Sequence, residues 1–529
     1  MSPKYIDLSP DEASSLIERV RSRTLDEKDY ELVVRLIETV LILYQALSEK
    51  GHSIQRLLRR FFGVKTESTK NVLKGSQESE KAAERSVPPA QSDATKKKGH
   101  GRNGAAAYSN APRIPVPHEC LKAGQLCPLC LRGKLYPLKP PAVIVRISGH
   151  APVEAKIYEC ERFRCNGCLE VFTASLPEGV AGEKYDESAR AIIACLKYGS
   201  GFPFYRLEGL QESMQTPLPA STQWDEVEKL ADTVHPVYPA LIGWAAQADV
   251  VHNDDTTMRI LALAKEIAST GAERTGIFTT GIVSILDGYR AALFFTGNHH
   301  AGENIRELLK LRAEGLPPPV QMCDALSWNA PEDLKAIFSN CLTHARRNFV
   351  DVHSSFPEEC AYLLEALGKI YHHDAMAKER NLSKEERLQF HQIHSGPVMD
   401  ELKAWMNEQI DQKKVEPNSG LGKAIEYMRK RWEKFTLFLR IPGAPLDNNI
   451  CEQLLKRAVL HRKNSLFYRT EHGAYIGDML MSLIATCSLN SVNPFHYLVA
   501  LQRHAPEVRK HPGQWLPWNY QQRLNPPPS

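Results

Sequence analysis

The chain has 529 residues, of which 43% are hydrophobic and 24% charged, a composition typical of soluble globular proteins. This length exceeds one ordinary hydrophobic core, so we expect several domains. The net charge of +4 is small for this length and alone indicates no nucleic-acid partner, so the distribution of charge matters more.

The start of the chain predicts a helix followed by a linker. MSPKYIDLSPDEASS has no apolar core of a secretory signal, so we expect a cytoplasmic protein without a membrane span. Apolar spacings of three and four predict helix within 1–62, either a short coiled coil with another copy or a hairpin on its own chain. Residues 63–112 have the Lys-, Glu-, Ser- and Gly-rich composition of a basic disordered linker.

Two CxxC pairs follow within 113–180. Their four thiols are Cys127, Cys130, Cys165 and Cys168. A CxxC turn presents two thiolates to one ion, and structural zinc takes four ligands. Strand-like AVIVRI and AKIYECERFRC, which lie between the pairs, predict a β-hairpin that brings the pairs together. We predict a structural zinc site, with reduced thiols or a redox pair as the alternative.

Residues 181–248 contain short helical patterns separated by polar turns. They predict a helix-turn-helix-like DNA-binding region, with Ser221 or Thr222 capping the third helix. Helical packing without a DNA role fits the same pattern.

The rest of the chain changes from strands to helices. In 249–340 two β-rich runs meet at Asp287-Gly288, a hairpin signal. We predict a helical insertion over 341–440, a further helical part of the core over 441–505, and a Pro-rich tail over 506–529.

Three carboxylates lie where a buried element would need a cation. VVHNDDTTMRIL places Asp254 and Asp255 on a predicted strand, where successive side chains alternate faces, so only one can point into a given site. Asp324 follows the apolar-rich PPPVQMC, and Glu452 lies in the predicted helix of LDNNICEQLLKRAVL. Three such carboxylates can hold two divalent metals about 3.5–4 Å apart for attack on phosphodiesters. Turn and helix caps, or an ion pair between Glu452 and the lysine four residues on, are the alternatives.

Basic residues cluster beside the second and third carboxylates, which favours a polyanionic substrate. Either cluster alone also fits a solvated helix face. The predicted DNA-binding residues are Arg346, Arg347, Lys456, Arg457, Arg462 and Lys463.

In their order, these motifs resemble those of the DDE-type transposases of the insertion-sequence 66 family, almost end to end. LLRRFFGVKTE resembles that family's zipper-like segment, and the block from GHGRNGAAAY to EVFTASLPEG resembles its zinc-binding domain. HNDDTTMRIL and PLDNNICEQ followed by HRKNSLF are similar to its catalytic segments, and CLTHARRNF resembles the Cys-x-x-His and Arg-Arg segment that follows its second aspartate. Two positions depart from the pattern: Asp255 stands where glutamate is usual, and Ala325-Leu326 where Gly-Tyr is frequent.

The resemblance implies roles for specific residues. Asp254, Asp324 and Glu452 would form the catalytic, metal-binding triad, and the four CxxC cysteines would bind Zn²⁺. Cys341 and His344 match a family motif to which we assign no role from the sequence.

The resemblance also implies a fold and an activity. The fold is an α/β ribonuclease-H-like catalytic core with an all-helical insertion, plus an N-terminal helix, a zinc-binding β module and a helical DNA-binding region. The activity is DNA strand cleavage and strand transfer with Mg²⁺ or Mn²⁺ at the ends of an insertion sequence, in the bacterial nucleoid. Expected partners are terminal inverted repeats, target DNA, further copies of the chain and accessory proteins of the same element. The alternatives are a catalytically inactive zinc-containing DNA-binding protein and a ribonuclease-H-like nuclease without joining activity.

Overall fold

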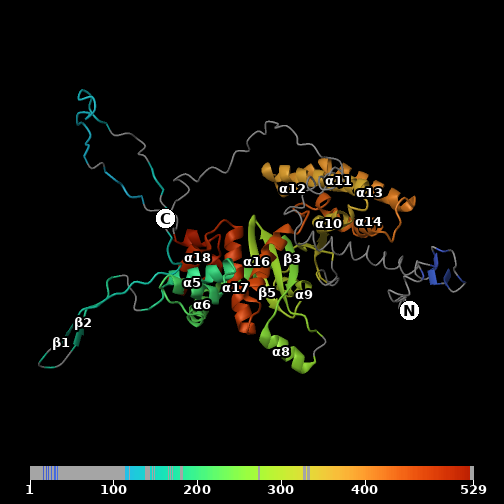
Figure 1. Ribbon diagram of the computed structural model, residues 1–529. Helices are drawn as coiled ribbons and strands as arrows, with labels where there is room; N and C mark the ends of the chain where they lie inside the picture. Colours follow the sequence, from blue (N-terminus) through green and yellow to red (C-terminus); the bar gives the residue numbers. More distant parts are fainter. Residues whose placement is uncertain are drawn as a thin grey trace. The chain divides into compact units, whose positions relative to one another are not determined.

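The structure is a computed structural model (Figure 1). It describes scattered positions between 16 and 33, and 113–524 with gaps at 118–119, 137–142, 146, 148, 165, 167, 169–170, 179–182, 272–273, 326–328 and 330–333. Most of the predicted segment 1–62, the whole linker 63–112 and Cys165 lie outside the described residues. No helix in the described part of the chain is long and apolar enough to cross a membrane.

The chain divides into two compact units, which we name the sheet unit and the helical unit. Of the described residues, the sheet unit contains the positions between 16 and 33, 238–459 and 467–490; the helical unit contains those within 113–237, 460–466 and 491–524.

A five-stranded mixed sheet forms the centre of the sheet unit. Its strands are β3 (Val250–Thr257), β4 (Phe278–Leu286), β5 (Tyr289–Gly297), β6 (Val320–Cys323) and β7 (Ile337–Asn340). The order across the sheet is β5-β4-β3-β6-β7, in which β3, β4 and β5 are antiparallel neighbours while β6 and β7 run parallel to β3. The predicted hairpin turn is confirmed, because Asp287 and Gly288 both have positive φ, at 49° and 81°, as a two-residue type I′ turn requires.

The edge strand β5 is covered by helix α17 (Glu471–Leu489). Main-chain N–H groups of β5 donate at 2.6–3.1 Å to side chains spaced four residues apart, namely those of Asp478, Ser482, Thr486 and Asn490. An edge strand otherwise leaves its N–H groups unpaired and open to another chain. The polar stripe on an otherwise apolar helix therefore closes this side of the sheet. The other helices of the unit outside the insertion are α7 (Val237–Ala245), α8 (Leu261–Thr270), α9 (Ala301–Leu309) and α16 (Asn449–Ser465), and α16 ends within the helical unit.

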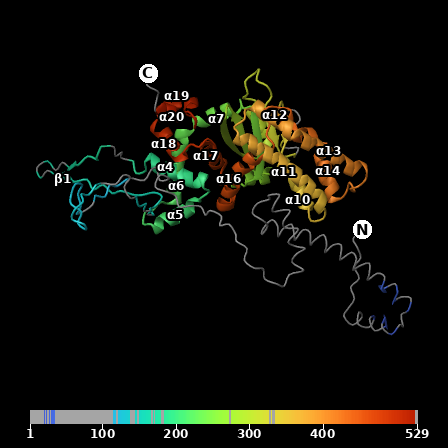
Figure 2. The ribbon, with the colours of Figure 1, turned by 90° about the horizontal axis from the view of Figure 1, so that it is seen from above.

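The residues between β7 and α16 form a bundle of helices, in the range where a helical insertion is predicted (Figures 1 and 2). Its elements are α10 (Leu342–Val352), α11 (Pro357–Glu379), α12 (Lys384–His394), α13 (Gly396–Asp411), α14 (Gly420–Lys430), α15 (Trp432–Phe435) and the 3-10 turn η4 (Leu437–Leu439). Phe349, Leu367 and Met428 are fully buried in one apolar cluster that also includes Val250 and Val320 of the sheet. The insertion therefore shares its core with the sheet and is positioned by it.

The helical unit contains the predicted DNA-binding region as far as residue 237, and the rest of that region belongs to the sheet unit. The elements of the helical unit are β1 (Arg162–Arg164), β2 (Val171–Thr173), α4 (Glu187–Ala194), the π-helix η2 (Cys195–Gly199), α5 (Phe204–Ser213), α6 (Ala220–Val234), α18 (Pro494–Arg503), α19 (Ala505–Lys510), η5 (Pro512–Trp515) and α20 (Tyr520–Leu524). The predicted cap is wrong: α6 begins at Ala220 after extended Pro219, so Ser221 and Thr222 lie inside the helix. Helices α19 and α20 occupy much of the predicted Pro-rich tail.

Candidate active site

Two of the predicted carboxylates lie at the same edge of the sheet. Strand β6 pairs with β3 only as far as the His252–Met322 pair, and Asp254 follows two residues later. Asp324 comes directly after Cys323, the last residue of β6. Because β3 and β6 are parallel, their carboxyl ends meet, and open α/β sheets bind ligands there.

Asp254 is surrounded by like charges. Burial raises the pKa of the Asp254 carboxyl to about 7, and the charge of Asp324 adds to this, with smaller contributions from Asp255 and Glu452. The Asp255 N–H donates to Asp254 Oδ1 at 2.8 Å, and this hydrogen bond acts to lower the pKa of Asp254. The other two predicted ligands, distant in sequence, therefore both act electrostatically on the Asp254 carboxyl.

Asp255 has a different environment. Its Oδ2 lies 3.0 Å from Nδ1 of His300 and accepts from the N–H of Ala301 at 3.4 Å. His300 in turn packs against the ring of Phe278. Asp255 thus fixes the start of α9, the helix that begins at Ala301.

An amide network supports Asp324. Asn329 donates its side-chain N–H to Asp324 Oδ1 at 2.6 Å. The Asn329 carbonyl accepts from Gln321 at 2.7 Å and from Asn253 at 3.1 Å, and Gln321 also donates to Asn253 Oδ1 at 2.9 Å. Gln321, Asn253 and Asn329 are all buried, so their mutual bonds fix the Asp324 carboxylate with little freedom.

Helix α16 brings Glu452 to the sheet through a glycine. Gly281 of β4 is the register partner of Asp254. A Cβ at Gly281 would lie 3.0 Å from the Leu455 side chain, and the Cys451 thiol donates to the Gly281 carbonyl at 3.2 Å. The absence of a side chain at Gly281 therefore sets how closely α16, and Glu452 in its first turn, approaches Asp254.

Asn448 fastens the start of α16 to strand β3. Burial lowers the pKa of His252 to about 4, so the ring is neutral and its Nδ1–H donates to Asn448 Oδ1 at 3.1 Å. Asn448 Nδ2 donates to the Asn253 carbonyl at 3.0 Å, and the Asn448 main-chain N–H donates to Cys341 Sγ at 3.2 Å. Sequence analysis did not single out Asn448, Gln321 or Asn329; the NN pair within the first turn of the predicted helix was the one available signal, because asparagine is frequent at helix starts.

Cys341 and His344 also converge on Glu452. Cys341 caps the amino end of α10 and His344 lies in its first turn. His344 Nδ1 is 3.7 Å from Glu452 Oε1, and potential ligand atoms of the three residues all lie within 4.8 Å of one another. The unassigned Cys-x-x-His motif therefore adjoins the third carboxylate.

The six predicted DNA-binding residues occupy different environments. Arg346 is buried and Arg347 exposed on α10, while Lys456 is exposed and Arg457 half-buried on α16. Burial lowers the pKa of the Arg457 guanidinium. Arg462 and Lys463 lie in the last turn of α16, where cations also stabilise the helix dipole, and belong to the helical unit.

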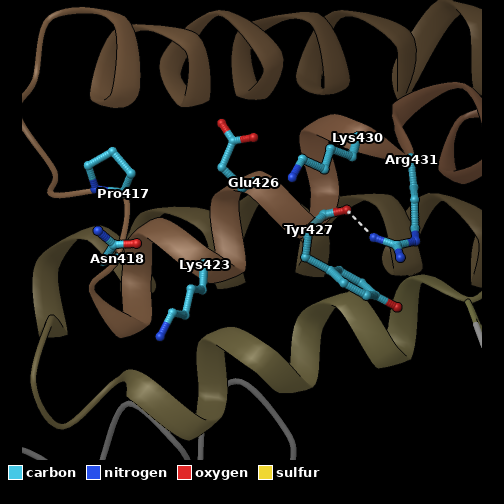
Figure 3. A pocket seen from close by; sticks show the side chains of 7 residues that line it. All are labelled: Pro417, Asn418, Lys423, Glu426, Tyr427, Lys430 and Arg431. Carbon is cyan, nitrogen blue, oxygen red and sulfur yellow. Dashed lines mark hydrogen bonds between the residues drawn. The ribbon is translucent and has the colours of Figure 1, made fainter.

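A basic pocket not predicted from the sequence opens in the insertion (Figure 3). It has a volume of about 570 Å³ and is lined by Pro417, Asn418, Lys423, Glu426, Tyr427, Lys430 and Arg431. The Arg431 guanidinium lies over the Tyr427 ring, 4.4 Å from its centre. Burial raises the pKa of Tyr427, the Arg431 guanidinium acts against this, and the charge of Asp324 adds to the effect of burial.

The first cysteine pair lies in a hairpin turn. An antiparallel bridge between Leu126 and Lys134 closes the turn around the first pair, in which Cys130 Sγ accepts the Gly133 N–H at 3.5 Å. Strands β1 and β2 flank the second pair. The predicted hairpin between AVIVRI and AKIYECERFRC is wrong: among the described residues, Arg162–Arg164 pairs instead with Val171–Thr173, across the second CxxC turn. Since Cys165 lies outside the described residues, the four-cysteine zinc site stays a prediction.

Comparison with known proteins places this site in a family. The model of a family described as Transposase IS66 family matches residues 182–476, more than half of the chain. The chain belongs to the IS66 transposase family. The match includes all three carboxylates and the Cys-x-x-His motif, and it confirms the resemblance on which the sequence analysis relied. As a member of a DDE transposase family, the protein is a transposase-type enzyme that acts on DNA and uses a divalent metal.

Curated relatives resemble much of the chain. Uncharacterized protein y4hP of Sinorhizobium fredii (strain NBRC 101917 / NGR234) is 26% identical over 389 residues, which are 68% of this chain and 67% of that protein. Uncharacterized protein y4jD of the same organism is 26% identical over 381 residues, 68% of this chain and 71% of that protein. Uncharacterized protein y4qI of the same organism is 24% identical over 356 residues, which are 63% of this chain and 62% of that protein.

Proposed function

We propose that this IS66-family protein cleaves DNA strands at the ends of an insertion sequence and joins them to target DNA by metal-dependent phosphoryl transfer. The observation that carries the proposal is the position of Asp254, a half-buried carboxylate whose pKa is raised by its partial burial and by the charges of Asp324 and Glu452. Repulsion among three carboxylates destabilises the fold unless a cation relieves it. Carboxylates whose pKa is strongly perturbed by burial and by like charges are frequent at functional sites.

The fold is consistent with a ribonuclease-H-like core. Three antiparallel strands followed by two parallel ones, ordered β5-β4-β3-β6-β7, place the first aspartate on the central strand and the second after its parallel neighbour. The glutamate follows on α16, after the helical insertion. This arrangement supports the assignment of Asp254, Asp324 and Glu452 as the triad.

The donor set fits Mg²⁺ or Mn²⁺. Both are hard cations that prefer carboxylate oxygens, and Glu452 Oε1 is buried without a hydrogen-bond partner in the described part of the chain. When bound by Asp254, Asp324 and Glu452, two such ions would activate water or a DNA 3′-hydroxyl and stabilise the leaving oxygen. The amides of Asn329 and Asn448 hold two of the ligand-bearing elements, so the carboxylates are positioned before any substrate arrives.

Positive side chains next to the site would hold the DNA backbone. Lys423, Lys430 and Arg431 line the pocket beside Tyr427, and Lys456 and Arg457 follow Glu452 on α16. Such groups neutralise phosphates without reading sequence. We assign recognition of the terminal repeats to the helical region 181–248 and to the cysteine module, in which Cys127, Cys130, Cys165 and Cys168 would bind zinc.

A strand-transfer assay tests the proposal. Labelled transposon-end DNA is incubated with the full-length protein and Mg²⁺, and the variants are Asp254→Asn, Asp324→Asn and Glu452→Gln. We expect each to lose at least a hundredfold in both cleavage and joining, with Asp255→Asn as the matched control that retains them. Undiminished joining by Asp254→Asn would remove this residue from the site. Cleavage without joining would favour a nuclease, and DNA binding without cleavage would favour an inactive DNA-binding protein.

A further inference from the structure

The space between helices α10 and α16 contains three different donor atoms. Cys341 Sγ, His344 and the Glu452 carboxylate come from the first turns of two helices, and their potential ligand atoms lie within 4.8 Å of one another. They differ chemically from the triad, which is made of oxygen ligands. One of them, Glu452, belongs to both sets.

Two atoms that face each other on His344 and Glu452 lack hydrogen-bond partners in the described residues. These atoms, His344 Nδ1 and Glu452 Oε1, are both buried. Their separation of 3.7 Å is too long for a hydrogen bond. Two ligands bound to one zinc-like ion at about 2.0–2.2 Å can lie this far apart. A cation between them would satisfy both atoms.

The third donor is the Cys341 thiol, whose pKa burial raises to about 11, and two features of its surroundings act against this effect. Cys341 is fully buried at the amino end of the 11-residue helix α10, where the helix dipole favours a negative charge. Its Sγ already accepts the N–H of Asn448 at 3.2 Å, and hydrogen bonding to a thiolate stabilises the charged form.

We propose that Cys341, His344 and Glu452 form a site for a borderline transition-metal cation of the Zn²⁺ or Co²⁺ class. One thiolate, one imidazole and one carboxylate select such ions over Mg²⁺, which requires oxygen ligands in an octahedron. Three protein ligands leave one coordination position open, as in zinc sites that are not purely structural.

The shared glutamate has a consequence that rests on the proposed function. When a zinc-class ion occupies Glu452, this carboxylate is drawn away from Asp254 and Asp324. Zn²⁺ therefore competes with Mg²⁺ and inhibits strand cleavage. The Cys-x-x-His motif makes the transposase sensitive to the metal supply of the cell.

Cobalt provides a direct readout that needs no DNA. The full-length protein, after its zinc content has been measured, is titrated with Co²⁺, and the near-ultraviolet thiolate-to-cobalt band is recorded with the number of ions bound. We expect one Co²⁺ per chain that depends on Cys341, so that Cys341→Ala abolishes its band and His344→Ala weakens its binding at least tenfold. Cys360→Ala is the matched control, because Cys360 is a fully buried thiol in α11 of the same unit.

Two further variants make the result decisive. Cys127→Ala reports on the separate cysteine module: a band lost in Cys127→Ala but kept in Cys341→Ala overturns the proposal, as does the absence of any Cys341-dependent Co²⁺ binding. His344→Gln, a milder change at a side chain that is 26% exposed, is measured alongside, with thermal melts showing that each variant is folded.

Inhibition is measured separately from binding. Zn²⁺ is added to Mg²⁺-dependent cleavage reactions, and each variant is compared with its own rate without Zn²⁺. We expect at least tenfold lower Zn²⁺ sensitivity in His344→Ala than in wild type or Cys360→Ala. If Co²⁺ binds as expected but no variant cleaves DNA, the proposed function fails and the metal site stands; if cleavage occurs without Cys341-dependent Co²⁺ binding, the metal site fails and the function stands.

Discussion

Asp254 and Asp255 are consecutive on β3, yet their carboxylates have opposite surroundings. Asp255 lies 3.0 Å from the His300 ring, whereas the half-buried Asp254 experiences the negative charges of Asp324 and Glu452. Alternation along a strand separates two chemically identical side chains into one that fixes a helix start and one that faces like charges.

The first prediction is that Asp254→Asn stabilises the metal-free protein while it removes activity. The pKa of Asp254 is raised in the folded state, so the ionised carboxylate destabilises the fold as pH rises from about 4 to about 7, with an upper bound of about 4 kcal/mol. The gain from asparagine should therefore be largest above pH 7 and vanish below about pH 4. Chelator-treated wild type and variant are compared by urea unfolding at pH 8, 6 and 4. Equal stability at pH 8 would contradict the argument, and Asp255→Asn serves as the control.

The second prediction concerns the glycine below α16. In Gly281→Ala the new methyl group meets Leu455 at 3.0 Å, so helix α16 and Glu452 must shift by a few tenths of an ångström. Overpacking of this kind costs about 1–3 kcal/mol, and misplacement of a reacting group can cost about a hundredfold in rate. We expect a modest loss of stability and a loss of cleavage of at least tenfold.

A double variant separates crowding from other causes. Leu455→Ala removes the atoms that the new methyl group meets, so Gly281→Ala/Leu455→Ala should regain activity relative to Gly281→Ala. Gly297→Ala is the matched control on the same sheet, because a Cβ there meets no atom within 4 Å. Failure of the double variant to recover, at normal stability, would show that α16 is not positioned through Gly281.

The third prediction concerns the core of the insertion. Asp374 is buried and accepts from Arg387 at 2.7 Å, with His391 at 3.3 Å and Lys378 at 2.7 Å. Burial acts to raise the pKa of the Asp374 carboxyl, but the bonds from His391, Arg387 and Lys378 outweigh it and hold the pKa well below its usual value. The carboxylate therefore contributes stability above its unfolded pKa near 4, and this contribution is lost as pH falls further.

Asp374→Asn tests this contribution. Removing one partner of a buried charge network lowers the free energy of unfolding by about 3–5 kcal/mol. Urea-induced unfolding of the insertion should therefore occur at a lower urea concentration in the variant than in wild type at pH 7. The difference from wild type should shrink as pH falls below 4. Asp411→Asn, which breaks the solvent-exposed pair with Arg429, should leave the transition nearly unchanged. A similar effect of both substitutions would argue against a special role for Asp374.

Local chemistry and ordered motifs made part of this structure predictable. The turn at Asp287-Gly288 depends on two adjacent residues that tolerate positive φ, and it formed as predicted. Partial burial of the carboxylates was predictable from the apolar runs around them. The polar stripe that pairs α17 with β5 was not predictable, because the hydrogen-bond partners of Ser482 and Thr486 lie on a strand nearly 200 residues away in the sequence.

The errors have equally local causes. The cap at Ser221 or Thr222 failed because Pro219 is already extended, which lets the helix start at Ala220. The long hairpin between the cysteine pairs failed because a CxxC turn closes its own short hairpin, and pairing across a few residues costs less entropy than pairing across many. Asn448 was missed since one buried amide leaves no periodic signal.

The last prediction concerns the basic pocket. Lys423 and Lys430 are exposed beside Tyr427 on α14, and each phosphate contact on duplex DNA contributes a slope of about −0.9 to the dependence of log K on log salt concentration. Lys423→Ala/Lys430→Ala should therefore weaken binding of end DNA uniformly across sequences and reduce the slope by roughly 2. Fluorescence anisotropy at a series of NaCl concentrations without divalent metal measures this. Lys369→Ala/Lys413→Ala, which removes two exposed insertion lysines outside the pocket, should leave the slope unchanged. If the two pairs behave alike, the DNA backbone does not enter the pocket, and the lysines of α14 serve only as solvated surface.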